Sequence, residues 1–195
     1  FHNCDNLVSI TLPEGITEIG KNTFYNCYNL TSITIPDNVT SIGEAAFMLC
    51  SKLATVNLGQ NITEIGPGAF IGCAITSFDI PSNVTEIQNF TFQDSKLLTS
   101  VTISENVTSI GEYAFAGCSN LKSITIPASV TEVSANAFAN TTGITKITFQ
   151  HTGATPISIG TGAFKNALGL TEVTLPEGLE NIAESMFEGC TEIVK

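Results

Sequence analysis

One phenylalanine returns at nearly constant spacing along the whole chain. The intervals between successive copies are 23, 23, 23, 22, 23, 23, 26 and 23 residues. Around each copy the sequence repeats the frame L-x-x-I-x-I-P-x-x-V-T-x-I-G-x-x-A-F-x-x-C. Self-similarity at a fixed period predicts a repeat architecture in which each unit packs on its neighbours. The recurring residues are Phe1, Phe24, Phe47, Phe70, Phe92, Phe115, Phe138, Phe164 and Phe187.

Residues 30–53 illustrate what each unit is expected to form. Residues 33–35 alternate apolar and polar, which predicts a strand, and Pro36 ends it because proline has no N–H for the ladder. Residues 39–42 predict a second extended piece, and residues 44–49 suit about one helical or 3₁₀ turn. Aliphatic residues at L-x-x-L-x-L with a period in the twenties are typical of leucine-rich repeats. The predicted fold is a leucine-rich repeat solenoid of the α/β horseshoe class, predominantly β. It has a parallel sheet on one face, short strands and 3₁₀ or helical turns on the other, and about eight 23-residue repeats.

We expect residues 1–195 to form a single solenoid fragment, truncated at both ends. A solenoid has no internal domain boundary, since each unit contacts only its neighbours. Phe1 and Lys195 each fall inside a repeat, and neither end has the atypical polar unit that closes such a stack.

Two units break the period. Cys73-Ala74-Ile75 is one residue shorter than its counterparts, and three extra residues lie within Gln150 to Ser158. Insertions in solenoids fall in surface loops of one face, which is often the binding face. His151 and Thr152 are therefore candidate contacts. The alternative is a tolerated bulge without a role.

Charge and composition exclude several functional classes. The net charge is -11, and all seven basic residues are lysines, which argues against binding to nucleic acid or anionic lipid. No apolar run is long enough for membrane insertion by this segment. The two histidines, His2 and His151, have no triad neighbour in sequence, so we expect no enzyme and no cofactor.

The cysteines occupy one repeat position, three residues after the phenylalanine. Their spacing lacks any C-x-x-C pair, which argues against a zinc site, and we expect no metal. Other units place Ser95, Thr141 and Ala167 there. A position that accepts all four residue types favours a small buried filler, so reduced thiols are expected rather than disulfides.

The repeat resembles the BspA-like leucine-rich repeats. The residues that carry this resemblance are the I-T-I-P of 33–36, the V-T-x-I-G of 39–43, Ala46-Phe47 and Cys50, with copies over essentially the whole chain. Such proteins occur on bacterial surfaces and in parasitic protists such as trichomonads. The resemblance implies an adhesin that binds host matrix or plasma proteins or partner cells. It brings no catalytic residues with it.

Alternation places one set of strand residues outward on the main sheet. These side chains are small, mostly neutral and rich in hydroxyl groups, which suits recognition of a protein or glycan by hydrogen bonds. Solubility is an alternative reason for them, because threonine is a good strand former. An ice-binding face is a further alternative, against which the interrupting Asn57, Asp79, Lys146 and Glu172 count. The candidate contacts are Ser32, Thr34, Thr55, Asn57, Ser77, Asp79, Ser100, Thr102, Ser123 and Thr125.

The sequence thus predicts a cell-surface or secreted adhesion module. Its partner would be a host matrix, plasma or partner-cell surface protein, with a glycan as the alternative. The alternative is a structural stalk that presents another domain and binds nothing itself. Seven N-x-[ST] sequons occur, four of them in one repeated turn at Asn38, Asn61, Asn83 and Asn106. The repeat itself explains these, because asparagine suits the turn and threonine the strand.

Overall fold

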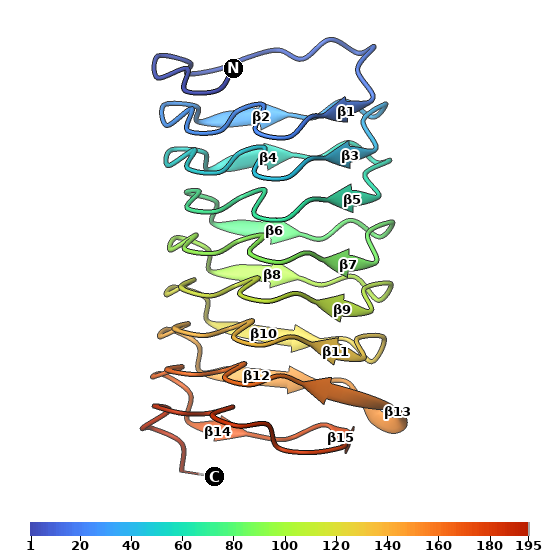
Figure 1. Ribbon diagram of the computed structural model, residues 1–195, viewed down its shortest axis with the longest axis vertical. Coiled ribbons are helices and arrows are strands. Elements are labelled where there is room, and N and C mark those ends of the chain that lie inside the picture. The colour runs from blue at the N-terminus through green and yellow to red at the C-terminus, as the bar shows by residue number, and fades with distance from the viewer. Residues whose placement is uncertain (195) are drawn as a thin grey trace.

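The computed structural model describes residues 1–194, with Ala154 described by its backbone alone. The chain forms a β-solenoid of about seven turns, here called rungs, with parallel sheets on two sides (Figure 1). The expected count of about eight repeats stays a prediction. Within the described residues all regular structure is strand. The strands are β1 (Glu18–Ile19), β2 (Ser32–Thr34), β3 (Ser41–Ile42), β4 (Thr55–Asn57), β5 (Glu64–Ile65), β6 (Ser77–Asp79), β7 (Glu86–Ile87), β8 (Ser100–Thr102), β9 (Ser109–Ile110), β10 (Ser123–Ile126), β11 (Glu132–Val133), β12 (Lys146–Phe149), β13 (Thr152–Ile159), β14 (Glu172–Val173) and β15 (Glu177–Leu179).

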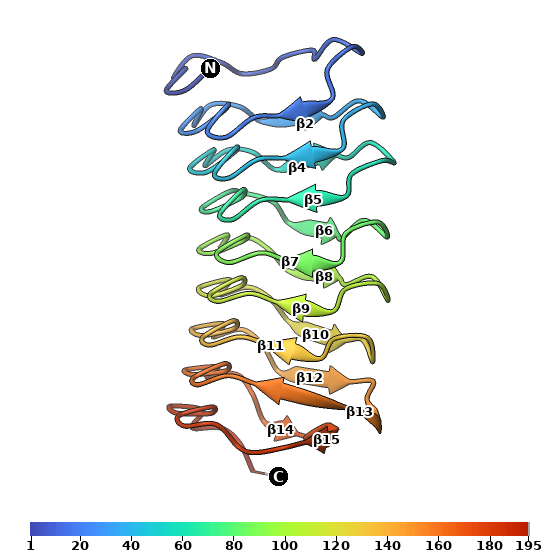
Figure 2. The ribbon, with the colours of Figure 1, turned by 45° about the vertical axis from the view of Figure 1, so that its right-hand side comes forward.

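Each rung contributes one strand to each of two sides. The even-numbered strands from β2 to β14 form the main face, and the odd-numbered strands form the lateral face (Figure 2). All pairing is parallel and advances by one repeat, as between Ser32 and Thr55 or Glu18 and Ser41. The sequence period therefore sets the register, because equivalent residues lie side by side.

The repeat phenylalanines form one continuous stack through the core. Neighbouring rings lie 5.1–5.6 Å apart at interplanar angles of 3–11°. From Phe24 to Phe164 these side chains are fully buried. The aliphatic strand residues, such as Ile33 and Ile42, close the core on the two sheet sides.

The segment around each phenylalanine is a hydrogen-bonded turn, and the helical or 3₁₀ turn expected there is not found in residues 1–194. Residues two before and two after the phenylalanine have positive φ, as at Ala45 (51°) and Leu49 (64°) around Phe47. A left-handed residue interrupts a right-handed helix, so the chain winds tightly without forming one. Glycine and asparagine fill many of these places, including Asn22, Asn26, Gly68 and Gly72.

The glycine of V-T-x-I-G lets successive rungs approach closely. A Cβ at Gly66 would lie 2.7 Å from the backbone nitrogen of Glu44 on the preceding rung. A Cβ at Gly111 would lie 2.6 Å from the backbone nitrogen of Asn89. The backbone hydrogen bond from Gly111 N–H to the Ile87 carbonyl is 2.7 Å long, and Ser134, which takes the place of the glycine one rung later, makes the equivalent bond to Ile110 at 2.8 Å.

Both sides of the solenoid are interrupted at the same level. The lateral face divides into β1-β3-β5 and β7-β9-β11-β13-β15, and on the main face β2-β4 is separate from β6-β8. Among the described residues no backbone hydrogen bond joins β4 to β6 or β5 to β7. Figure 1 shows β4 and β6 more widely spaced than β2 and β4. The main face divides once more, between β8 and β10.

Two sequence changes coincide with this interruption. The chain from Cys73 to Ile75 lacks the closing turn that other units make, for example from Leu53 N–H to the Cys50 carbonyl at 2.9 Å. In addition, Phe78 takes the buried strand position that holds isoleucine or valine in the other rungs. Its ring packs against two stacked phenylalanines, 5.3 Å from Phe70 and 4.8 Å from Phe92. The larger ring therefore lies in the core beside these two stacked phenylalanines, at the level where the strands do not pair.

The three extra residues before Phe164 lengthen a strand, which corrects the expectation of a surface loop. Strand β13 runs along the lateral face and pairs with both β11 and β15. Its register shifts between Thr152 and Ile157, so the insertion is absorbed as a bulge. The bulged end protrudes at the edge of the stack in Figure 1.

Candidate interaction face

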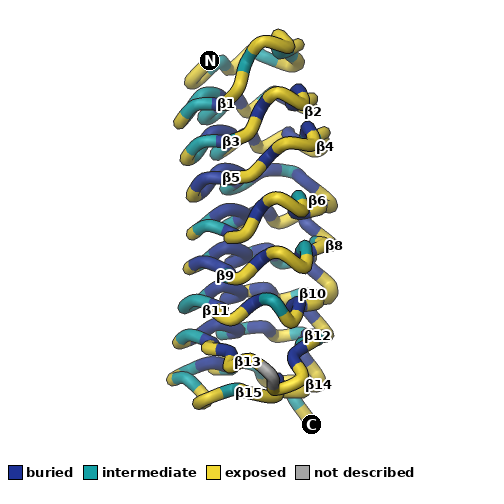
Figure 3. The backbone as a smooth tube through the Cα atoms, turned by 90° about the vertical axis from the view of Figure 1, so that its right-hand side faces the viewer, coloured by how far each residue is buried: buried dark blue, intermediate teal, exposed yellow. Residues whose placement is uncertain are grey.

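The ten candidate side chains of the main sheet are all exposed, as the alternation predicts. In each strand they flank an inward residue, such as Ile33 in β2 or Ile124 in β10. Figure 3 shows the resulting recurrence of exposed positions from rung to rung. The candidates are Ser32, Thr34, Thr55, Asn57, Ser77, Asp79, Ser100, Thr102, Ser123 and Thr125.

The sheet pairing brings these candidates together in three groups. Thr34 lies opposite Asn57, whose Nδ2 donates a hydrogen bond of 3.2 Å to the threonine Oγ1. Asp79 lies opposite Thr102 on the next pair of strands. Ser123 and Thr125 belong to the third group, with β12 and β14. The sequence predicts that all ten lie on one continuous sheet, and the structure divides that sheet between β4 and β6 and again between β8 and β10.

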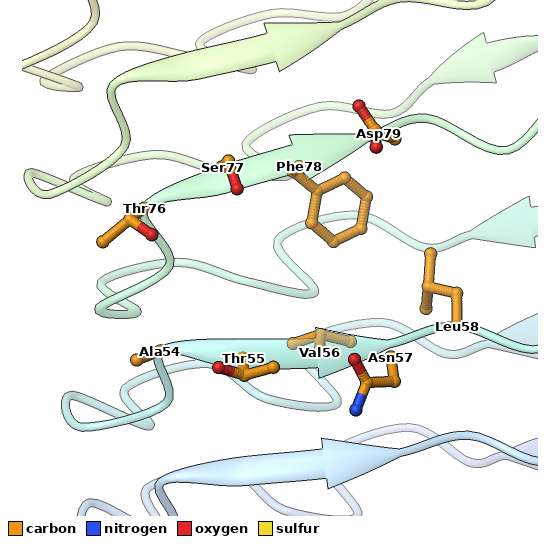
Figure 4. Close-up of a pocket in the computed structure, with 9 residues that line it drawn as sticks. All are labelled: Ala54, Thr55, Val56, Asn57, Leu58, Thr76, Ser77, Phe78 and Asp79. Carbon is orange, nitrogen blue, oxygen red and sulfur yellow. The ribbon is translucent and has the colours of Figure 1, made fainter.

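A hollow of about 520 Å³ lies between the first and second groups. Residues 54–58 form one wall and residues 76–79 the other (Figure 4). Asn57 and Asp79 bring their side chains to this hollow, and Leu58 and Phe78 contribute apolar atoms. We call it the inter-rung groove. Its volume falls within the range of about 300–1,000 Å³ that is usual for ligand sites.

The groove is acidic. Asp79 is its one ionisable side chain, and the lining residues include no lysine or histidine. The two ion pairs among the described residues, Lys21–Glu44 and Lys165–Glu188, involve other carboxylates. With a net charge of -11 on the whole chain, the local field favours a positively charged group at Asp79.

Sequence reasoning missed the groove residues Val56, Leu58 and Phe78, because inward residues were assigned to the core. One signal was available, namely a phenylalanine at a place that otherwise holds isoleucine or valine, five residues after a one-residue deletion.

The second candidate region comprises His151 and Thr152, and only one of these two side chains is exposed. Thr152 is exposed at the start of β13, but the His151 ring is buried. Its Nε2 lies 2.6 Å from the Val130 carbonyl oxygen, and its Nδ1 has no partner among the described residues. With 8% of its surface exposed, His151 lines a hollow beside Phe149 and Pro176, and its role as a contact stays a prediction.

The cysteines lie in the core or at its edge. Cys27, Cys50, Cys73 and Cys118 are buried, and all six thiols are free. Each buried Sγ donates to the phenylalanine carbonyl of the preceding rung, as from Cys50 to Phe24 at 3.0 Å. Ser95 makes the same bond to Phe70 at 2.8 Å. Burial raises the pKa of the Cys50 thiol to about 12, so it stays neutral at physiological pH. The predicted role as a small buried filler is confirmed.

The repeated sequon asparagines hold the corner between the two faces. Asn61 Nδ2 donates to the Asp37 carbonyl of the preceding rung at 2.9 Å, and Asn106 donates to Ser82 at 2.7 Å. Asn83 makes the equivalent bond, 3.1 Å to Gln60, across the interruption. These amides are structural donors, which the turn propensity of asparagine alone did not reveal.

An exposed glutamate begins each of the lateral strands β1, β5, β7 and β11, and these glutamates form no cluster of three that suits a cation within the described residues. They are Glu18, Glu64, Glu86 and Glu132. Glu64 and Glu86 lie on strands β5 and β7, which do not pair. Within residues 1–194 no group of three or more histidine, cysteine, aspartate or glutamate side chains could hold a metal ion.

The repeat frame decides the family. Residues 1–99 and 85–195 match the BspA type leucine-rich repeat region, with six copies. The chain belongs to the BspA-type leucine-rich repeat family. Solenoids of this family are typically repeat scaffolds without catalytic groups, and leucine-rich repeat proteins generally mediate protein interactions. The sequence has no match among curated proteins.

Solved structures with similar folds are bacterial repeat proteins. The leucine-rich repeat protein of T. pallidum is 26% identical, with a TM-score of 0.77 over 84% of this chain and 78% of that one. A leucine-rich cell surface protein of Faecalibacterium prausnitzii is 27% identical, with a TM-score of 0.65 over 91% and 69%. The pneumococcal vaccine antigen PcpA shares the fold at 21% identity, with a TM-score of 0.58 over 91% of this chain and 47% of that one.

None of the described segments forms a helix with the length and hydropathy that a membrane span needs.

Proposed function

We propose that this BspA-type solenoid is a cell-surface or secreted adhesion module that binds proteins of a host or a partner cell through its main face. The observation that carries the proposal is the exposure of all ten candidate side chains on one side of successive rungs. Their short hydroxyl, amide and carboxylate groups project from a rigid stack, so little side-chain entropy is lost when a partner binds. The similar cell surface protein of Faecalibacterium prausnitzii supports the location.

A binding assay with two matched variants tests this function. The purified chain is passed over immobilised matrix and plasma proteins, beside the triple variant Thr34→Lys, Thr102→Lys and Thr125→Lys. The control variant, Ser51→Lys, Ala128→Lys and Thr142→Lys, adds the same charge at exposed turn residues. Both variants must first show the thermal melt of the parent chain.

Loss of saturable binding in the main-face variant alone supports the proposal. Equal binding by all three proteins moves the contact away from the main face. Absence of binding throughout favours the alternative of a structural stalk, whose function would reside in another domain.

A further inference from the structure

We propose that the inter-rung groove binds an extended peptide segment with basic side chains, which pairs with the strand edges that the interruption leaves open. The inference rests on the adhesion function, because it names the part of a partner protein that the main face would take. Its support comes from backbone groups, space and charge.

Strand β4 directs unpaired backbone groups into the groove. The Asn57 carbonyl accepts a hydrogen bond of 2.8 Å from Ile35 N–H, so Asn57 faces β2. Alternate residues of a parallel strand bond to opposite neighbours, and Val56 therefore directs its N–H and C=O toward β6. Within residues 1–194 no protein group pairs with this Val56 backbone.

Strand β6 presents the matching edge. Ile80 N–H donates to the Thr102 carbonyl at 2.9 Å, which places the bonds of Phe78 and Ile80 on the β8 side. Ser77 and Asp79 accordingly direct their N–H and C=O groups toward β4. These groups likewise have no protein partner in the described part of the chain. Two facing strand edges with free donors and acceptors are a template for an added strand.

The groove has room for such a segment. Neighbouring strands lie about 4.8 Å apart, so an inserted strand needs about twice that spacing between its two neighbours. The hollow of about 520 Å³ sits where the wider spacing of β4 and β6 is visible in Figure 1. Successive side chains of the guest would point alternately inward, against Leu58 and Phe78, and outward, toward the mouth of the groove (Figure 4).

Charge selects the kind of peptide. The exposed Asp79 carboxylate sits at the groove with no lysine or histidine among the lining residues. A lysine or arginine on the outward side of the guest would pair with it. An acidic segment would instead meet Asp79 within a chain of net charge -11.

The test uses the whole chain and a defined probe, a seven-residue blocked peptide of alternating threonine and lysine. Its control has the same side chains but N-methylated amides, which cannot donate hydrogen bonds. Affinity is measured by calorimetry, and amide hydrogen exchange of Val56 and Asp79 is followed by NMR. Each backbone hydrogen bond contributes about 0.5–1.5 kcal/mol, so N-methylation at several positions should weaken binding roughly tenfold or more. The two amides should exchange more slowly when the unmodified peptide is added.

Three variants locate the contact. Asp79→Asn should weaken binding roughly two- to fivefold, as for an exposed ion pair. Glu172→Gln removes a carboxylate from β14 of the same face and should change nothing. A repaired chain, with Phe78→Ile and one serine inserted between Cys73 and Ala74, restores the 23-residue spacing and should close the groove. It should lose peptide binding while it keeps any binding of the immobilised proteins that uses Thr125.

Equal binding of the N-methylated peptide, or full binding by the repaired chain, would overturn the proposal. So would absence of saturable binding of the unmodified peptide at millimolar concentration. If the repaired chain does not fold, the affinities measured with the N-methylated peptide and with the Asp79→Asn variant still test the proposal. If the parent chain binds immobilised protein but not the peptide, the groove alone is refuted. If the parent chain binds the peptide but no immobilised protein, the main-face adhesion site is refuted.

Discussion

The rungs from β7 to β13 and the junction between β4 and β6 show two ways of joining neighbouring units. In the first region the lateral strands form one continuous ladder, and Gly111 allows the backbones to approach. At the junction both ladders are absent, and the turn contacts carry the stack. Phe70 N–H still donates to the Thr91 carbonyl at 2.9 Å, and Asn83 reaches Gln60 at 3.1 Å.

The difference shows that the turn contacts and the sheet hydrogen bonds contribute separately to the stacking of rungs. The phenylalanine stack passes the junction at 5.6 Å between the rings of Phe70 and Phe92, close to its value elsewhere. A solenoid can therefore open both of its faces at one level without ending. In a chain of nearly identical units, this opening is what distinguishes one level of the main face from the others.

The largest expected effect is at the phenylalanine stack. Phe70→Ala should lower the free energy of unfolding by about 3–5 kcal/mol, since a fully buried ring is removed. Because the corners are the main link at the junction, the variant should also unfold in two steps in urea. Phe115→Ala, the control within the continuous ladder, should lose similar stability in a single step. A single step for both would show that the two regions are equally coupled.

The second largest effect is expected at the glycine position of the repeat, where two opposite substitutions can be compared. Gly111→Gln should destabilise by roughly 1–3 kcal/mol, because its Cβ would press on the backbone of Asn89. Gln88 occupies the equivalent place just after the junction, where the rungs are apart. Gln88→Gly should cost only about 0.5–1 kcal/mol, mainly in backbone entropy. Thermal melts of both variants measure the difference, and equal losses would contradict the packing account.

The asparagine corner gives a smaller effect. Asn61→Ala should cost about 0.5–1.5 kcal/mol for the lost hydrogen bond to Asp37. Asn83→Ala should cost at least as much, since its bond to Gln60 spans the junction where sheet bonds are missing. Chemical denaturation provides both values. A smaller loss at Asn83 than at Asn61 would mean that this corner does not support the junction.

The smallest effect is a dependence on alkaline pH. The pKa of the Cys50 thiol is raised to about 12 by burial, from an ordinary value of 9.0. Below pH 9 the thiol is neutral in both folded and unfolded chains, so stability is retained there. Between about pH 9 and about 12 only the unfolded chain ionises, and stability falls as pH rises. Cys50→Ser introduces the residue that Ser95 already provides at the equivalent place, and it should show a shallower decline of the thermal midpoint across this window.

The solenoid and its exposed residues could be predicted because the repeat fixes them locally. Alternation around Ile33 or Ile124 determines which neighbours point outward, and the constant period places equivalent residues side by side. The turn around each phenylalanine was harder to predict, because residues 44–49 have an ordinary helical composition. The left-handed backbone at Ala45 and Leu49 becomes apparent only by analogy with the glycine and asparagine of other units.

The groove could not be predicted from one unit at a time. The deletion at Cys73 and the ring of Phe78 are each visible in the sequence. Their joint effect depends on contacts between two rungs, where Phe78 packs against both Phe70 and Phe92. The bulge in β13 depends likewise on its pairing with β11 and β15.

The interrupted ladders also determine how the molecule responds to mechanical load. Hydrogen bonds of parallel sheets in a solenoid run along its long axis, so a pull along that axis loads every rung in series. The junction between β4 and β6 has the fewest such bonds, and it should part first. Under shear flow at a cell surface, the stack would then lengthen at this one level while the rungs on either side keep their shape.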